Sequence, residues 1–398
     1  ASLAVTTAST TTITGSSTTG LAPGMMIAAA NIPIGTFITS ITDATSFVIS
    51  QAATTSATGT VAVTSGVIEV NNQSAVLQLQ GGITVANPVV LTSSGDWGQI
   101  SGIDTMGAVL SASGSNILTA DLILGFARPG ADGTNKLFGV GALSGATLTL
   151  GNVKFDNASG GTNRNTIFQV NGAGNVVFTG VLDNVNGAVG SSELRKYSTG
   201  TLTFNAANSV AESTLQLYRG TTIFQGAATA AGTTSLNVFQ NAVLTFDNTG
   251  TNTANRLANK PLQILGGTVN FLPAAAGSSQ FSSAALSLGN GGSTINLGSG
   301  GNLAVTFASL TQNGGATLDL IGLFGTTNNK LLFTTAPGLT GGAVAATNGL
   351  LARITTNGNE FATYNTTGLA TNAFGLQPFA GYSVAPNILS APANATYK

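Results

Sequence analysis

The feature of this sequence that most limits its fold is a strand-like pattern that returns about every two dozen residues. Short stretches with apolar residues at every second position are bounded by Gly, Asn, Asp or Ser, the residues that turns require. The last large apolar residues of these stretches are 23, 26, 20, 22, 25, 26 and 23 residues apart. They are Phe155, Phe178, Phe204, Phe224, Phe246, Phe271, Leu297 and Leu320. Such a recurrence is typical of a solenoid whose coils stack on one another.

The periodicity also separates this fold from the other β architectures. Apolar residues recur at every second position rather than at the helical spacing of three and four residues. In addition, β-branched residues and Gly outnumber strong helix formers. A sandwich or a barrel gives no reason for one strand pattern to return at this interval. We therefore predict an all-β chain built mainly as a parallel β-helix, or β-solenoid.

The two ends of the chain depart from the repeat. Near the start, Pro23-Gly24 and Pro33 break the pattern, and a hairpin is predicted around Asp43. The last segment is rich in proline and does not continue the period. The predicted organisation is a small N-terminal β module or assembly strand at 1–65, a solenoid at 66–360, and a C-terminal cap or extended tail at 361–398.

Composition narrows the range of functions. The 398 residues include 12 Lys+Arg, 13 Asp+Glu, no His and no Cys, with a net charge of -1. Without Cys and His, thiolate chemistry, disulfides and the usual proton carrier near neutral pH are excluded, so we predict no enzyme, cofactor or metal. Because nucleic acid requires clustered Lys and Arg, it is not a predicted partner. Hydrophobic residues make up 42%, enough for an ordered core.

Two further features bear on location. The chain starts Ala1-Ser2 with no initiating Met, as expected after removal of a signal peptide. No run of about 18 apolar residues exists that would cross a membrane as a helix. We expect a secreted protein, extracellular or at the cell surface.

Several segments resemble a known repeat family. Glu193-Leu194-Arg195-Lys196 followed by G-T-L-T-F-N-A-A-N at 200–208, and V-L-T-F-D-N-T-G-T-N-T-A-N-R-L at 243–257, resemble the autotransporter-associated β-strand repeat. The resemblance covers roughly residues 65–370. It implies a right-handed parallel β-helix in a secreted or surface-exposed bacterial passenger with an adhesive or structural role, and no catalytic residue. The sequence departs from a complete autotransporter because it lacks a C-terminal run of amphipathic transmembrane strands. The first module is similar to small β modules of bacterial surface and phage fibre proteins, through residues 20–25 and 32–36.

One group of acidic residues is a candidate ligand site. Residues one coil apart stack in a solenoid, so Asp132, Asp156 and Asp183, separated by 24 and 27 residues, could form a column that binds Ca²⁺ or polarises a sugar. The alternative is that Asp156-Asn157 and Asp183-Asn184 close turns after core residues. The adjacent pair Arg195 and Lys196 is predicted at a solvated edge or paired with Glu193 and Glu212, with an acidic glycan as the alternative ligand.

The open ends of a β-helix suggest the function. Unpaired strand edges invite another chain, so we predict a structural subunit of a bacterial surface or extracellular filament that assembles head-to-tail with itself. Donor strands are expected from 4–14 or 385–398. The alternatives are a monomeric adhesin or phage-fibre-like protein that binds glycans or cell surfaces and, third, a polysaccharide lyase or hydrolase. The candidate assembly residues are Ala4, Val5, Ile13, Tyr382, Val384, Ile388 and Tyr397.

Overall fold

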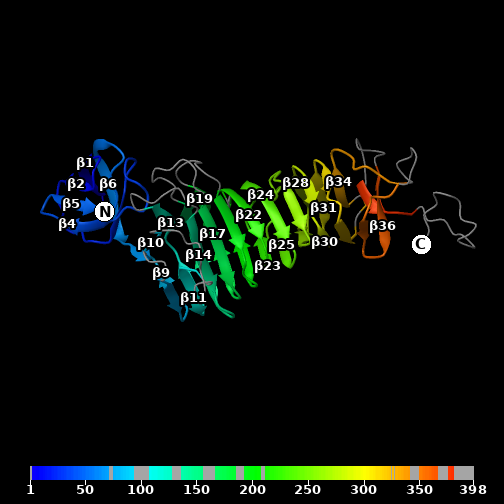
Figure 1. The fold of residues 1–398 in the computed structure, drawn as a ribbon, viewed down its shortest axis with the longest axis horizontal. Coiled ribbons are helices and arrows are strands. Elements are labelled where there is room, and N and C mark those ends of the chain that lie inside the picture. The colour runs from blue at the N-terminus through cyan, green and yellow to red at the C-terminus, as the bar shows by residue number, and fades with distance from the viewer. Residues whose placement is uncertain are drawn as a thin grey trace, which may run out of the picture. The chain divides into compact units, whose positions relative to one another are not determined.

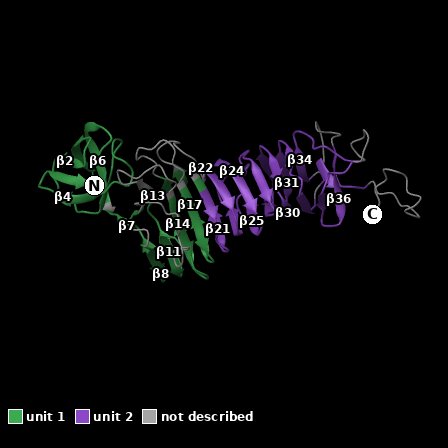
Figure 2. Cartoon of the chain, viewed as in Figure 1, with its two compact units in different colours: residues 1–193 green, residues 194–398 purple. Residues whose placement is uncertain are grey.

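A computed structural model gives the fold of the chain. It describes residues 2–70, 75–93, 107–127, 136–155, 166–184, 192–207, 211–323, 325–326, 328–340, 349–365 and 375–380. In these ranges every regular element is a strand, and no helix is long and apolar enough to span a membrane. The chain divides into two compact units, residues 1–193 and 194–398, each described separately below (Figure 2).

Unit 1 begins with a six-stranded antiparallel sheet in the order β3-β6-β1-β2-β5-β4 (Figure 1). Its two edge strands approach each other through the bridge between Met26 and Phe37 and the hydrogen bond that Gly24 N donates to Ile38 O, 2.7 Å. Alternation in the strands points eight apolar side chains into a core of their own, and Ile32, from the isolated bridge with Ala29, is the ninth core residue. The strands are β1 (Ser2–Ala8), β2 (Thr12–Gly15), β3 (Met25–Ala28), β4 (Ile38–Ile41), β5 (Ser46–Ile49) and β6 (Ser56–Gly66). The core residues are Val5, Ile13, Ile27, Ile32, Ile38, Phe47, Ile49, Val61 and Val63.

The rest of unit 1 consists of coils that each give one strand to three parallel sheets. We name each sheet after its first strand. The β7 sheet holds β7 (Ile68–Val70), β10 (Val89–Ser93), β13 (Leu122–Ala127), β16 (Val153–Phe155) and β19 (Leu182–Asn184). The β8 sheet holds β8 (Leu77–Gln80), β11 (Val109–Ser113), β14 (Lys136–Ala142) and β17 (Thr166–Gly172). The β9 sheet holds β9 (Thr84–Val85), β12 (Ser115–Leu118), β15 (Thr147–Leu150) and β18 (Asn175–Phe178). The order of strands along the chain is consistent with a β-solenoid.

Unit 2 contains two long parallel sheets from its first coil and gains a third sheet later. The β20 sheet holds β20 (Ser192–Lys196), β22 (Ala211–Leu217), β24 (Gly232–Phe239), β26 (Leu262–Leu265), β29 (Leu286–Leu288) and β32 (Leu310–Gln312). The β21 sheet holds β21 (Thr201–Phe204), β23 (Gly220–Phe224), β25 (Ala242–Asp247), β27 (Thr268–Leu272), β30 (Gly291–Leu297), β33 (Ala316–Gly322) and β35 (Ile354–Thr356). The β28 sheet holds β28 (Ser278–Ser283), β31 (Asn302–Phe307), β34 (Asn329–Phe333) and β37 (Gly375–Pro378).

The last strand pairs of unit 2 change direction. Strand β36 (Glu360–Asn365) runs antiparallel to both β35 and β37, and so joins the β21 and β28 sheets at the final coil. Strand β37, and β36 apart from its first residue Glu360, fall in the segment 361–398, for which a cap or extended tail is predicted. In unit 1, the predicted boundary of the N-terminal module at residue 65 falls inside β6.

The predicted internal ladder is confirmed in its centre and wrong at its two ends. Phe204, Phe224, Phe246 and Phe271 are consecutive partners across the β21 sheet, with ring centroids 4.8, 5.5 and 5.5 Å apart, and Leu297 follows. These four rings and Leu297 form one buried column on the inner face of the sheet.

Both errors have a geometric cause. The partner of Phe178 is Leu150, whereas Phe155 lies in the β7 sheet, because a three-sheet coil repeats the same apolar pattern on another face. At the other end Leu297 pairs with Gly322, and Leu320 pairs with Ile295. Spacing alone does not show which face a strand occupies.

Close stacking of coils leads to a test at two glycines. Gly172 has φ of 86° and pairs with Ala142, and a Cβ at Gly172 would collide with the Ala142 carbonyl oxygen. Gly145 has a similar φ of 78°, but no atom lies within 4 Å of a Cβ there. We expect Gly145→Ala to lower the free energy of unfolding by about 1 kcal/mol from backbone strain alone. Gly172→Ala should cost about 3 kcal/mol, because steric overlap is added. Urea unfolding measures the free energy of unfolding of both variants. Equal losses would show that the distance between coils at Gly172 leaves room for a methyl group.

Candidate functional site

The outer face of the β7 sheet carries one row of side chains in parallel register. Glu69, Val90, Ile123, Lys154 and Asp183 occupy corresponding positions on successive strands. Val90 and Ile123 are buried although they point away from the coil interior. Their neighbours along each strand point inward and are buried too, so both faces of β10 and β13 are covered. The row is therefore apolar and covered in its middle and charged at its flanks.

The N-terminal module covers this apolar pair. A Cβ built on Gly35 would lie 3.3 Å from Ile123 Cγ2 and 4.0 Å from Val90 Cγ1. The loop between β3 and β4 of the N-terminal module, which contains Gly35, thus packs directly on strands β10 and β13. A sequence signal for this contact exists: Val89-Val90-Leu91 and Leu122-Ile123-Leu124 are unbroken apolar runs, which are typical of strands buried on both faces.

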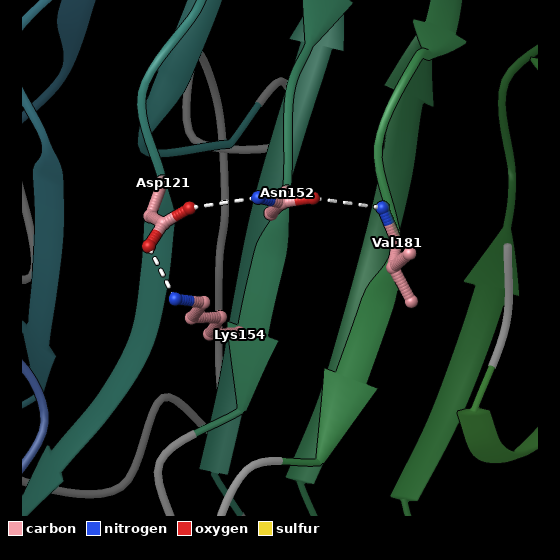
Figure 3. Close-up of polar contacts among 4 residues, drawn as sticks. All are labelled: Asp121, Asn152, Lys154 and Val181. Atoms are coloured by element: carbon pink, nitrogen blue, oxygen red, sulfur yellow. Dashed lines mark hydrogen bonds and ion pairs between the residues drawn. The ribbon is translucent and has the colours of Figure 1, made fainter. Parts of the chain in front are cut away.

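Next to the covered pair, four residues of three successive coils form a polar chain (Figure 3). Lys154 makes an ion pair with Asp121, and Asn152 Nδ2 donates to Asp121 Oδ1 over 3.1 Å. Asn152 Oδ1 in turn accepts a hydrogen bond from Val181 N, 3.1 Å. Each link joins one coil to the next, so this cluster fixes the register of β13, β16 and β19.

This cluster does not supply the groups that sugar hydrolysis needs. Glycosidases use two carboxyl groups that face the same bond, whereas Asp121 is neutralised by Lys154, and the register partner of Asp183 is also Lys154. Asp132 and Asp156 of the predicted ligand column lie outside the described residues. Within the described ranges, no three Asp, Glu, His or Cys side chains are grouped so that they could hold a metal ion.

Lys196 contradicts the prediction of a solvated edge for the pair Arg195-Lys196. Its side chain is fully buried, and Nζ donates to the carbonyl oxygens of Ser198 at 2.7 Å, Gly200 at 2.9 Å and Arg219 at 2.7 Å. Alternation in β20 turns Leu194 and Lys196 inward, which places the ammonium group at the corner between β20 and β21. Burial lowers the pKa of Lys196 to about 7. The ammonium group serves as a cross-link between coils.

Arg256 plays a similar role where the coil has no third strand. It is fully buried in the irregular segment 248–261, and it donates to Gly226 O at 2.7 Å, Ala228 O at 2.8 Å and Thr251 O at 2.6 Å. Its Nε donates to Asn248 Oδ1. Burial lowers the pKa of Arg256 to about 10, with Asp247 acting in the opposite direction, so the guanidinium is charged at neutral pH. Arg256 is not among the residues predicted from the sequence, because the asparagines around it are typical of an exposed loop and give no sign that it is buried.

The candidate assembly residues of the N-terminal segment lie inside the module. Ala4 and Val5 belong to β1, which pairs with β2 on one side and β6 on the other, and Ile13 in β2 is fully buried. In this structure residues 4–14 are therefore not a free donor strand, because their backbone hydrogen bonds are made within the module. Tyr382, Val384, Ile388 and Tyr397 lie outside the described residues.

Unpaired strand edges lie outside the N-terminal module. In the described part of the chain, β8 pairs only with β11 in unit 1, and β32 pairs only with β29 in unit 2. Exposed apolar side chains flank β8: Val76 and Ile83, with Ile83 45% exposed. In unit 2 the exposed apolar residues Ile321, Leu323 and Phe361 belong to β33, to the residue after it and to β36 rather than to β32, and Leu323 is 69% exposed. The edges of β8 and β32 are therefore two places where another chain can add.

Comparisons with protein-family models, curated proteins and solved structures gave no match to this chain.

Proposed function

We propose that this chain is a secreted structural subunit of an extracellular surface layer or filament, built as a right-handed parallel β-helix. The observation that carries the proposal is the pair of unpaired parallel edges, β8 in unit 1 and β32 in unit 2, with the exposed apolar residues Val76 and Ile83 flanking β8. Parallel edges are templates for strand addition, and proteins that remain monomeric usually block them. The lack of His and Cys and the scarcity of charge support a structural role over an enzymatic one.

The proposed contact is head-to-tail, with β32 of one copy beside β8 of the next. Leu310 faces the interior in line with Leu286, and Leu77 stands in line with Val109. If Leu310 meets Leu77, Thr311 meets Gln78 on the outer face, and the parallel ladder continues with its apolar column intact. Such a heterologous contact does not close on itself and produces open filaments.

The other two sheets restrict this contact to one face. In unit 2, β36 closes the β21 and β28 sheets by antiparallel pairing, so those sheets do not end in a free parallel strand at that coil. Addition at the β20 sheet alone gives the filament a defined polarity.

A cysteine cross-link tests this register, since the native chain has no Cys. Neighbouring Cα atoms across a strand pair lie within the range that a disulfide spans. We expect the double variant Gln78→Cys with Thr311→Cys to give a ladder of covalent oligomers under mild oxidation. The control, Gln263→Cys with Thr311→Cys, should give none, because Gln263 lies on an interior strand that is paired on both sides. The proposal is wrong if the protein is monomeric at all concentrations by light scattering and the double-cysteine variant gives no covalent oligomers.

A second candidate is a monomeric adhesin that binds a glycan. It is favoured by the stack of Tyr197, Tyr218 and Phe239, whose centroids are 4.6 and 4.5 Å apart, beside the hydrogen-bonded amides of Gln216 and Asn237. Aromatic rings and amides are common in sugar sites, but here the rings cover one another's faces. Binding of monomers to a glycan array, without the covalent ladder, would favour this candidate.

A further inference from the structure

Two tyrosines of successive coils lie face to face in unit 2. Tyr197 follows β20 and Tyr218 follows β22. Tyr218 N donates to Lys196 O at 3.0 Å, which places the two tyrosines in register. Their ring centroids are 4.6 Å apart and their planes meet at 6°. At this separation the ring carbons of one tyrosine lie over those of the other at about van der Waals contact.

The backbone that carries both rings is fixed by one buried group. The fully buried Lys196 donates from Nζ to Ser198 O and Arg219 O, both at 2.7 Å. These carbonyl groups belong to the residues that directly follow Tyr197 and Tyr218. The two rings are therefore held opposite each other by the backbone as well as by their own contact.

The stack restricts which groups the ring of Tyr218 meets. Its second face is covered by Phe239, with ring centroids 4.5 Å apart and planes at 15°. Phenylalanine has no hydroxyl group to oxidise, so a reaction of the Tyr218 ring with a second phenol is directed to Tyr197. The side chain of Tyr197 is 38% exposed, so an oxidant reaches it from solvent.

The third tyrosine of the described residues is placed differently. Tyr364 is fully buried, and its hydroxyl group donates to Phe333 O at 2.9 Å and accepts from Phe333 N at 2.7 Å. The ring that it contacts is that of Phe333, tilted by 58°. Tyr382 and Tyr397 lie outside the described residues. Within the described part of the chain, two phenol rings are stacked only at Tyr197 and Tyr218.

We propose that Tyr197 and Tyr218 form an oxidative cross-linking site, at which a one-electron oxidant such as a peroxidase with hydrogen peroxide joins the rings as dityrosine. Each phenol gives up one electron and its hydroxyl proton and becomes a phenoxyl radical, with unpaired spin on the carbons ortho to the oxygen. Two ortho carbons in face-to-face contact share these electrons in a new carbon–carbon bond.

The remaining steps restore both phenols. Each bonded carbon releases its hydrogen as a proton, and each oxygen takes one up. The pair loses two electrons and two protons in all, and one molecule of hydrogen peroxide takes them up to form two molecules of water. The new bond finally lies in the plane of both rings, so one ring has to turn. The partly exposed Tyr197 is free to do so, because Tyr218 lies between two rings.

The product is a covalent link between two coils of a chain that has no cysteine. A cross-link between residues far apart along the chain reduces the freedom of the unfolded state. The linked protein should therefore unfold at a higher urea concentration than the unlinked protein. The site does not depend on filament assembly.

The test oxidises the full folded chain with persulfate and a light-activated ruthenium complex, a one-electron oxidant that remains active in urea. Trypsin and a glutamate-specific protease separate the two tyrosines, because Glu212 lies between them and Lys196 and Arg219 border them. We expect dityrosine fluorescence and a linked pair of peptides, 197–212 with 213–219, that is two hydrogen atoms lighter than their sum. In the urea-unfolded chain, the matched control, this pair should be a minor product among links between all five tyrosines.

Two sets of variants sharpen the test, with circular dichroism to confirm that each is folded. Tyr218→Phe keeps the stack but removes one phenol, so it should lose both the linked pair and the rise in urea midpoint. Tyr197→Phe with Phe239→Tyr should move the link to residues 218 and 239, whose rings are 4.5 Å apart. If this double variant does not fold, the comparison with the unfolded native chain carries the test.

Three results would overturn the proposal. The first is a folded native protein that forms the link between Tyr197 and Tyr218 no more often than the unfolded chain does. The second is persistence of the linked pair in Tyr218→Phe, because the product would then not be dityrosine. The third is the formation of covalent oligomers without the link between Tyr197 and Tyr218, since other tyrosines would then be the reactive ones.

Discussion

Replacing Arg256 by methionine is expected to lower the free energy of unfolding by about 4 kcal/mol, because it leaves several buried acceptors without a donor. The carbonyl oxygens of Gly226, Ala228 and Thr251 and the Asn248 amide oxygen all accept hydrogen bonds from this side chain. The residue is fully buried, so water does not replace the lost donors without opening the coil. Urea or thermal unfolding followed by circular dichroism measures the change.

Arg353 provides a matched control. Its guanidinium also donates to two backbone carbonyls, Gly314 O at 2.6 Å and Asn313 O at 3.2 Å, but the residue is exposed. Arg353→Met should therefore cost no more than about 0.5 kcal/mol. Similar losses of unfolding free energy in the two variants would mean that burial of the carbonyl acceptors does not determine the cost of Arg256→Met.

Replacing Lys196 by methionine is the second large expected effect, about 3 kcal/mol. The ammonium group satisfies three carbonyl oxygens from two coils, and methionine keeps the volume while removing all three donors. Lys154→Met is the control, because the ion pair of Lys154 with Asp121 is partly exposed and contributes at most about 1 kcal/mol. A loss at Lys196 no larger than at Lys154 would contradict the cross-linking role.

Lys196 also predicts a pH dependence. Burial lowers its pKa from 10.5 to about 7 in the folded protein, so between these values the unfolded chain binds more protons than the folded chain. Stability then rises with pH across this window, because the folded protein no longer has to bury the charge. We expect the native protein to gain stability from pH 7 toward pH 10 relative to Lys196→Met. Parallel pH profiles of the two proteins would show that the three carbonyl groups keep the ammonium charged.

Much of the fold was readable from the sequence because backbone pairing and side-chain alternation have a local signature. The absence of a helical period and the return of T-L-T-F-like strands gave an all-β chain with parallel sheets. The central ladder from Phe204 to Leu297 followed from spacing alone. Errors arose where the same spacing fits more than one strand or register. Phe155 lies at the expected interval but on another sheet, and Leu320 lies two residues before Gly322, the true partner of Leu297.

The candidate sites were less readable. Lys196 follows Arg195 in a sequence that reads as a polar edge, yet strand alternation and the corner geometry turn it into the interior. The donor strand predicted at Ala4 and Val5 has the composition of an edge strand, but long-range pairing with β6 places it between two neighbours. Neither outcome is encoded within a few residues of the position concerned.

That the chain is all-β, repetitive and poor in ionisable groups follows from its composition and from the period of its apolar residues. Which coils carry three strands and which two, where the N-terminal module packs through Gly35, and which strand edges stay unpaired are visible only in the folded chain. These features depend on long-range contacts: a buried carbonyl must find a donor, and the donors at Lys196 and Arg256 reach it from another coil. Such partners are distant in sequence, and only the folded coil brings them within hydrogen-bonding distance.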